Sequence, residues 1–247
     1  MLLTNPVSND PRVRKEVASL AGAGHEVIVI GVRSGESPYF ERIDGYCIHR
    51  IKTLKLMFKK TILNRRANRR NCDVQGSASF LIKLRADVSN IISVLWLNMA
   101  LARSAVKQQA DVYRAHDLDT LLAGFLAKWW TGKKLIYDFH ELFTEQYKEG
   151  IKTKLWYLFY SGLERLLIKR TDFRLTVCRS LGEWVTERYR INGIVTIRNV
   201  PPLQEWSSSP ARDDYEQVIL YHGGYIVTED SNNSLRVRDT YNPEQLC

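Results

Sequence analysis

Hydrophobic and polar positions follow two different periods along the chain. Short apolar runs, which predict strands, lie at residues 1–4, 26–30, 111–115, 134–138, 173–178 and 194–197. Between them lie segments whose apolar residues recur every three or four positions, at residues 11–21, 78–109, 118–130, 154–169 and 180–189. Regular alternation of strands with helices predicts an α/β fold, in which helices cover both faces of a parallel sheet.

Local signals set some of the boundaries. Asp10 is placed to cap the first predicted helix. Asp44-Gly45 separates two alternating runs within residues 40–50, which is typical of a β-hairpin. Ser180 precedes Glu183 by three residues, so a capping box is expected at the start of the last helix.

The most apolar part of the chain lies within the predicted helix 78–109. Its window at residues 91–101 is about half as long as the ~20 residues that a membrane-spanning helix needs. We therefore predict a buried helix. The apolar face expected from the spacing consists of Leu81, Leu84, Val88, Ile91, Ile92, Leu95 and Met99.

The composition changes after residue 200. Prolines and serines at residues 201–202 and 207–210 break the alternation, which predicts a domain over 1–200 followed by a linker over 201–216. One further strand is expected at residues 217–221, opening onto Gly223-Gly224. The last residues, 227–247, are polar and show no period, so we expect a disordered tail there.

The charge is positive and unevenly placed. The net charge is +9, and residues 52–70 contain eight Lys or Arg and no acid. Such a block favours an anionic partner, such as a phospholipid surface, a phosphorylated substrate or nucleic acid, although a solvated basic loop is the plain alternative. The four cysteines lack ligand spacing and no secretory signal is present, so a cytoplasmic protein is expected.

Polar residues gather directly after the predicted strands. Arg12 follows the first strand and its loop, His116 and Asp117 follow the strand at 111–115, and three ionisable residues end the strand at 134–138. These three are Asp138, His140 and Glu141. Because the carboxyl ends of parallel strands share one edge, which is where ligands bind in such sheets, these residues are candidates for a site.

Each candidate has a structural alternative. His116-Asp117 is also typical of a loop pair or helix cap, and Arg12 can form a surface ion pair with Asp10. Three ionisable groups at the end of a buried strand are more informative, because they need solvent, a partner or a ligand. The histidines and carboxylates lack diagnostic metal spacing, so no metal is expected. A G-x-G-x-x-G fingerprint is missing, which disfavours a nucleotide-dependent oxidoreductase.

Several segments together resemble the family 4 glycosyltransferases of the GT-B fold. They occur in the expected order and span most of residues 1–225. These segments are residues 9–13 and 20–29, 111–122 (DVYRAHDLDTLL), 134–145 (KLIYDFHELFTE), 164–177, 197–201 and 220–224 (LYHGG).

The resemblance implies a two-domain enzyme. A Rossmann-like N-terminal domain would bind a glycan or lipid-linked acceptor, and a C-terminal domain would bind a nucleotide sugar. The family usually transfers sugar with retention of configuration, without a metal and without a cofactor besides the nucleotide-sugar co-substrate. Such enzymes serve polysaccharide biosynthesis.

The resemblance also implies roles for individual residues. His140 would face the donor sugar and the departing phosphate, beside Asp138 and Glu141. The acceptor side would be lined by Asp10, Arg12, His116 and Asp117. Gly223 and Gly224 would form a turn whose backbone N–H groups approach the diphosphate.

The chain departs from the family pattern in two respects. Arg114 and Phe139 stand where a histidine and a small residue are expected, and the chain ends 23 residues after Gly224. We therefore expect an acceptor domain with only the start of a donor domain, at 217–247, that is weakly active or inactive alone. Such a chain is either a truncated or frame-shifted glycosyltransferase or one whose donor half is a separate chain. The alternative is a non-catalytic module that binds an anionic lipid or phosphorylated glycan through residues 52–70, at the inner face of the membrane. Nucleic acid is not an expected partner.

Overall fold

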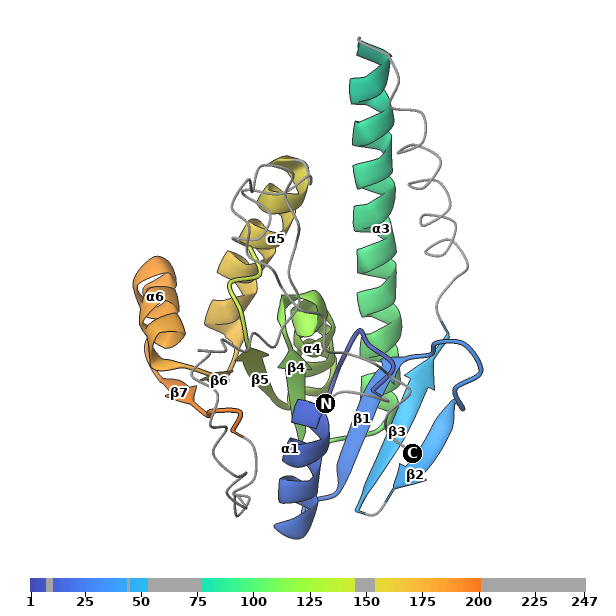
Figure 1. The fold of residues 1–247 in the computed structure, drawn as a ribbon, viewed down its shortest axis with the longest axis vertical. Helices are drawn as coiled ribbons and strands as arrows, with labels where there is room; N and C mark the ends of the chain where they lie inside the picture. The colour runs from blue at the N-terminus through green and yellow to red at the C-terminus, as the bar shows by residue number, and fades with distance from the viewer. Residues whose placement is uncertain (8–10, 44, 53–76, 145–153, 201–247) are drawn as a thin grey trace, which may run out of the picture. The chain divides into compact units, whose positions relative to one another are not determined.

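The computed structural model describes residues 1–7, 11–43, 45–52, 77–144 and 154–200 (Figure 1). Contacts between residues divide the chain into two units, residues 1–201 and 202–247. All of the described residues belong to the first unit. The predictions for Asp10, for most of the basic block at 52–70, and for Gly223 and Gly224 fall outside the described residues.

Strands and helices alternate as the sequence patterns predict, so the expected α/β class is confirmed. The elements in chain order are α1 (Pro11–Gly22), β1 (Val27–Val32), β2 (Phe40–Ile43), β3 (Tyr46–Ile51), α3 (Ser77–Lys107), β4 (Val112–His116), α4 (Leu118–Thr131), β5 (Lys134–Phe139), α5 (Lys154–Leu167), the 3₁₀ turn Ile168–Arg170, β6 (Phe173–Thr176), α6 (Arg179–Tyr189) and β7 (Ile194–Thr196).

The first residues of the chain join all the strands into one sheet. Leu2 bridges Ile30 of β1 on one side and Ala115 of β4 on the other, both in parallel. The strands on either side follow the orders β1-β3-β2 and β4-β5-β6-β7. All these pairings are parallel except the predicted β2–β3 hairpin, which turns at Gly45 with a positive φ of 84°.

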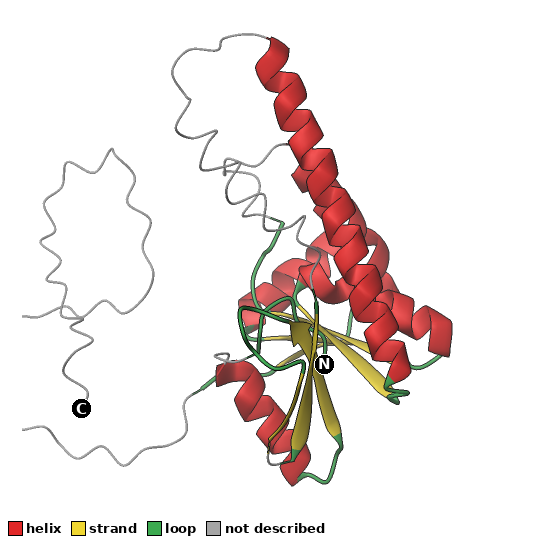
Figure 2. Cartoon of the chain, turned by 90° about the vertical axis from the view of Figure 1, so that its right-hand side faces the viewer, coloured by secondary structure: helices red, strands yellow, loops and turns green. Residues whose placement is uncertain are grey.

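Helices cover both faces of this sheet, as predicted (Figure 2). Alternate residues of β1 point to opposite sides. Val27 and Val29 pack in a cluster with Val13 and Val17 of α1. Ile30, one position further on, belongs to a larger cluster that includes residues of α3, α4, α5 and α6. Residues on the two faces of β1 therefore pack in two different hydrophobic clusters.

The strand that carries the main candidates is held from beneath by a buried carboxylate. Glu164 of α5 accepts hydrogen bonds from the hydroxyls of Tyr137 in β5, at 3.0 Å, and of Tyr189 in α6, at 2.5 Å. Burial, followed by the charge of Glu164, raises the pKa of Tyr137 well above its usual value. This link fixes β5 at the residue directly before Asp138.

Two local predictions were wrong. The helix α6 begins at Arg179 rather than Ser180, its N-cap residue Cys178 makes no side-chain capping bond, and Glu183 instead pairs with Arg179 at 2.8 Å. Of the apolar face predicted for α3, Val88, Ile92 and Leu95 are exposed and Ile91 and Met99 are half-buried, while the side chains of Leu81 and Leu84 lie outside the described residues.

The residues of α3 that are buried lie on a different side of the helix. They include Leu97, Asn98 and Leu101. Asn98 donates to the carbonyl of Asp119 and accepts from the N–H of Ala123, at 2.9 Å each, so a polar residue fastens α3 to α4. Among the described helices none is long and apolar enough to cross a membrane.

Candidate functional site

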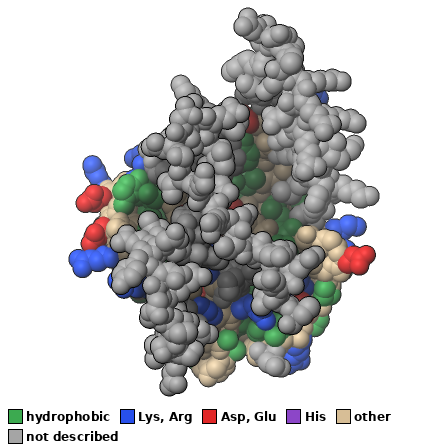
Figure 3. Space-filling model, viewed as in Figure 1, with side chains coloured by type: hydrophobic (Ala, Val, Ile, Leu, Met, Phe, Trp, Pro, Cys, Tyr) green, Lys and Arg blue, Asp and Glu red, His purple; other side chains and the backbone are tan. Residues whose placement is uncertain are grey.

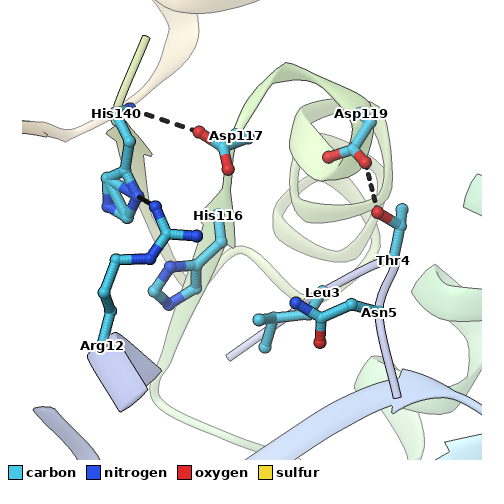
Figure 4. A pocket seen from close by; sticks show the side chains of 8 residues that line it. All are labelled: Leu3, Thr4, Asn5, Arg12, His116, Asp117, Asp119 and His140. Atoms are coloured by element: carbon cyan, nitrogen blue, oxygen red, sulfur yellow. Dashed lines mark hydrogen bonds between the residues drawn. The ribbon is translucent and has the colours of Figure 1, made fainter. Parts of the chain in front are cut away.

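The candidate residues meet where the order of the strands reverses. On one side of the bridges that Leu2 makes, the sheet continues through β1, β3 and β2, and on the other side through β4 to β7. The crevice beyond the carboxyl ends of the strands at such a reversal is the usual ligand site of an open α/β sheet. A pocket lies there, lined by Leu3, Thr4, Asn5, Arg12, His116, Asp117, Asp119 and His140 (Figure 4).

Asp138, at the end of β5, is the centre of the polar network beneath this pocket. Its side chain is 5% exposed. A single oxygen, Oδ2, lies 2.7 Å from Arg114 Nη2, 3.0 Å from His140 Nε2 and 3.3 Å from His116 Nδ1. Buried carboxylates are costly unless they are paired and hydrogen-bonded. Asp138 meets that requirement by holding two imidazoles and a guanidinium in fixed positions.

Arg114 and Glu16 extend the network to helix α1. Arg114 Nη1 pairs with Glu16 Oε1, and Glu16 Oε2 lies 3.6 Å from His116 Nε2. Glu16 stands one helical turn after Arg12, so both side chains project from α1 toward the same strand ends. The arginine that departs from the family pattern therefore links α1, β4 and β5.

The partners of His140 fix its tautomer. Arg12 Nη1 lies 3.1 Å from His140 Nδ1, and an arginine can only donate. Nδ1 is therefore the acceptor nitrogen, and the Nε2–H group donates to Asp138. Figure 4 shows Arg12 and both histidines together along one side of the pocket.

His116 is held in its neutral form. Burial and then the charge of Arg114 lower the pKa of His116 well below its usual value, despite the two nearby carboxylates. A neutral imidazole has one donor and one acceptor nitrogen. Nδ1 faces Asp138, so it is the donor, whereas Nε2 has no hydrogen-bond partner among the described residues.

Asp117 adopts a backbone conformation that is strained for any residue with a side chain. Its φ is 61° and its ψ is 170°, a region populated almost only by glycine. The carboxylate does not cap α4, which was the structural alternative; instead Oδ1 accepts the N–H of His140 at 3.2 Å. Burial, the largest influence, raises the pKa of Asp117. The strained residue thus ties the end of β4 to His140.

This strain leads to a testable order of stabilities. We expect Asp117→Gly to be more stable than Asp117→Ala by about 1–2 kcal/mol, because both variants lose the bond to His140 but only glycine relieves the strain. Equilibrium unfolding in urea measures the difference. At Asp119, two positions further on and within α4, the order should reverse, since glycine is about 1 kcal/mol worse than alanine in a helix. Equal stabilities at residue 117 would show that the backbone is not strained.

A second carboxylate lies across the pocket from the histidines. Thr4 donates its hydroxyl to Asp119 Oδ2, which joins the first strand to α4 (Figure 4). Burial raises the pKa of Asp119 to about 6. In sequence Asp119 also follows the strand at 111–115, together with His116 and Asp117, but it was not assigned a role among the predicted site residues.

The arrangement of His116, Asp138 and His140 also deserves comparison with metal sites. One ligand atom from each lies within 4.8 Å of the others. However, Asp138 Oδ2 already accepts from Arg114, and Arg12 lies against His140. A cation between these ligands would face two guanidinium groups, so the electrostatics favour a hydrogen-bonded network over a metal centre.

The structure brings most of the predicted residues together. Arg12, His116, Asp117 and His140 line one pocket, and Asp138 lies directly beneath it. Glu141 is exposed and does not line the pocket, although it follows His140 in sequence. Sequence reasoning missed Glu16, gave Asp119 no role and identified Arg114 only as a departure from the family pattern. The spacing of Arg12 and Glu16 on one face of α1 was the available signal for Glu16.

Comparison with known proteins agrees with this architecture. The model of the family described as Glycosyltransferase Family 4 matches residues 12–201. Among curated proteins no sequence matches the chain. Among solved structures, sucrose-phosphate synthase from Thermosynechococcus elongatus is similar, with a TM-score of 0.54 and 12% identity over 80% of this chain. At that identity the likeness concerns the fold, and the chain covers 47% of that protein.

Proposed function

Because the chain belongs to glycosyltransferase family 4, we propose that its described domain is the acceptor side of an enzyme that uses a nucleotide sugar. The acceptor is a glycan or a lipid-linked glycan. The observation that carries this proposal is the pocket at the strand reversal, where Asp138 holds His140 and His116 in place. A donor-binding domain supplies the opposite wall of the cleft.

The chemistry of the pocket lining suits a sugar. Asn5, Asp117 and Asp119 present side-chain oxygens or an amide to the pocket, which match the hydroxyl groups of an acceptor. Arg12 and His140 lie on the other side, where they meet the reacting end of the acceptor and the anionic donor. A concave site with a small number of convergent polar groups is typical of specific small-ligand binding.

The proposed reaction exchanges one bond at the anomeric carbon for another. The bond from this carbon to the phosphate oxygen breaks, and a bond to the acceptor oxygen forms on the same face of the sugar. The acceptor hydroxyl proton passes to the leaving phosphate oxygen, so atoms and charge balance. As the bond breaks, negative charge grows on the diphosphate and positive character grows at the sugar. Fixed donors stabilise the first of these charges in the transition state.

His140 is the residue that we place against the donor sugar. Its Nδ1 atom is an acceptor that Arg12 occupies in this structure, and Asp138 holds the ring through Nε2. A substrate hydroxyl that replaces Arg12 at Nδ1 would find an oriented acceptor. Arg12 would then exchange its contact with Nδ1 for one with the diphosphate.

Supplying a donor domain tests the division of labour. We expect the purified chain to transfer sugar weakly or not at all from a panel of nucleotide sugars. Joining the donor domain of a family 4 glycosyltransferase after residue 201 should give transfer, measured as release of the nucleoside diphosphate that requires acceptor. Transfer by the unmodified chain at ordinary enzyme rates, about 1–10³ s⁻¹, would contradict the proposed dependence on a donor domain.

A further inference from the structure

Helix α3 exposes four large apolar side chains, three of which its sequence pattern assigned to the core. Val88 is 45% exposed, Ile92 59%, Leu95 41% and Trp96 43%. The exposed fraction of a core side chain is close to zero, as it is for Leu101 in the same helix. Single exposed apolar residues are ordinary, but a contiguous group of this size marks an interaction surface.

These four residues form one stripe. Their positions follow helical spacing, so at 100° per residue they fall within a sector roughly 100° wide. The buried residues Leu97, Asn98 and Leu101 occupy a different sector, which packs on α4. The helix therefore has two apolar sides. One packs in the core of this domain, and the other is exposed and available to a binding partner.

The stripe lies on the part of α3 that projects beyond the sheet. Figures 1 and 2 both show the N-terminal end of this helix rising past the other described elements. Further along, α5 lies beside it, where Asp87 accepts a hydrogen bond from Trp156. On the face drawn in Figure 3, apolar, basic and acidic side chains of the described residues all reach the surface.

The charged residues of α3 itself are mostly basic. Residues 77–107 contain four Lys or Arg and one Asp. This residue, Asp87, is buried and accepts a hydrogen bond from Trp156 Nε1 at 3.0 Å. Arg85 and Arg103 are exposed near the two ends of the stripe, on the same side of the helix. Their charge complements an anionic surface.

We propose that this stripe docks the protein on an anionic phospholipid bilayer, with Ile92 and Trp96 entering the interface. A helix that combines apolar side chains with flanking basic residues lies in the plane of a membrane interface, where tryptophan is also favoured. Each basic residue near an anionic surface adds to the attraction. A second copy of the chain is disfavoured as the occupant, because it would bring two positive surfaces together. The inference does not depend on the proposed sugar transfer.

Cosedimentation of the full chain with vesicles tests this docking. We expect binding to phosphatidylcholine vesicles that contain phosphatidylglycerol. Binding to vesicles of phosphatidylcholine alone should be weaker by about tenfold or more. Raising the salt concentration should weaken binding without abolishing it, because salt screens the basic residues but not the apolar contacts. Equal binding to both kinds of vesicle would overturn the role of charge.

A pair of matched variants tests the stripe itself. Ile92→Gln combined with Trp96→Gln should reduce binding to the anionic vesicles by about tenfold or more. Trp129→Gln is the control, because Trp129 is 71% exposed on α4, outside the stripe, and its loss should change binding less than twofold. Circular dichroism should show the same fold for all variants, since the replaced side chains are exposed.

Two outcomes would overturn the inference. If the double variant binds anionic vesicles as well as the unmodified chain does, the stripe is not the docking surface, even if the protein binds membranes elsewhere. If light scattering instead shows a dimer that the double variant dissociates, and vesicles are not bound, the stripe joins two copies of the chain. Neither readout uses sugar transfer, so the proposed function can fail or stand separately.

Discussion

Replacing Asp138 with alanine should lower the free energy of unfolding by about 3–5 kcal/mol. The Asp138 side chain is 5% exposed, and that of its partner Arg114 is 14% exposed. Removal of the carboxylate leaves a largely buried guanidinium with one fewer anion, and it also takes the acceptor from His116 and His140. For a domain of this size the loss corresponds to a fall in Tm of about 6–20 °C.

A surface carboxylate supplies the control for this variant. Asp111 pairs with Lys133 at 2.7 Å, but its side chain is 89% exposed. Exposed ion pairs contribute about 0–1 kcal/mol, so Asp111→Ala should leave Tm almost unchanged. Thermal unfolding followed by circular dichroism measures both variants. If Tm falls by similar amounts in the two variants, Asp138 is not the residue that joins the buried polar network.

The layout of the fold could be predicted because two periodicities separate cleanly in this sequence. Apolar runs such as residues 134–138 end in polar residues, while the helices repeat every three or four positions. The fold class followed from their alternation. Helix boundaries were less certain, as at Ser180, because a capping motif is a local preference that neighbouring contacts can replace.

Part of the site could be predicted for a geometric reason. Parallel strands all end at the same edge, so His116, Asp117, Asp138 and His140 had to lie near one another once the sheet was parallel. The identity of their partners could not be predicted in this way. Whether Arg114 reaches Asp138 depends on β4 and β5 being neighbours, in the register His116 to Asp138. The order and register of the strands are properties of the assembled sheet, and the sequence pattern of a single strand does not give them.

The error on α3 has a related cause. Apolar residues occur on more than one side of this helix, so periodicity alone could not identify the side that packs. The buried side is fixed by Asn98, a polar residue that hydrogen-bonds to the backbone of α4 at two points. Hydrophobicity ranks Asn98 below Ile92, yet Asn98 is buried and Ile92 is exposed. Tertiary hydrogen bonds decided which side faces inward.

His140 should matter most for catalysis. Its ring is positioned by Asp138 at Nε2, and its Nδ1 atom faces Arg12 at the pocket. A side chain that acts only when charge develops in the transition state contributes about 10²–10⁴ in rate. We therefore expect His140→Ala to lower the rate of transfer at saturating substrate by about 10²-fold or more. Loss of its hydrogen bond to Asp138 should cost about 1.5–3 kcal/mol of stability, while Arg114 and His116 still hold the carboxylate.

The exposed His25, in the turn after α1, provides a matched control. It lies outside the pocket lining, so His25→Ala should retain the rate within about twofold. The comparison should be made in the chain joined to a donor domain, with circular dichroism to establish that each variant is folded.

The most direct test is the initial rate of acceptor-dependent nucleoside diphosphate release by these three proteins side by side. We expect the unmodified protein and His25→Ala to agree within about twofold, and His140→Ala to be slower by about 10²-fold or more. A folded His140→Ala variant that transfers sugar at the unmodified rate would contradict the assignment of this pocket as the site of the reaction.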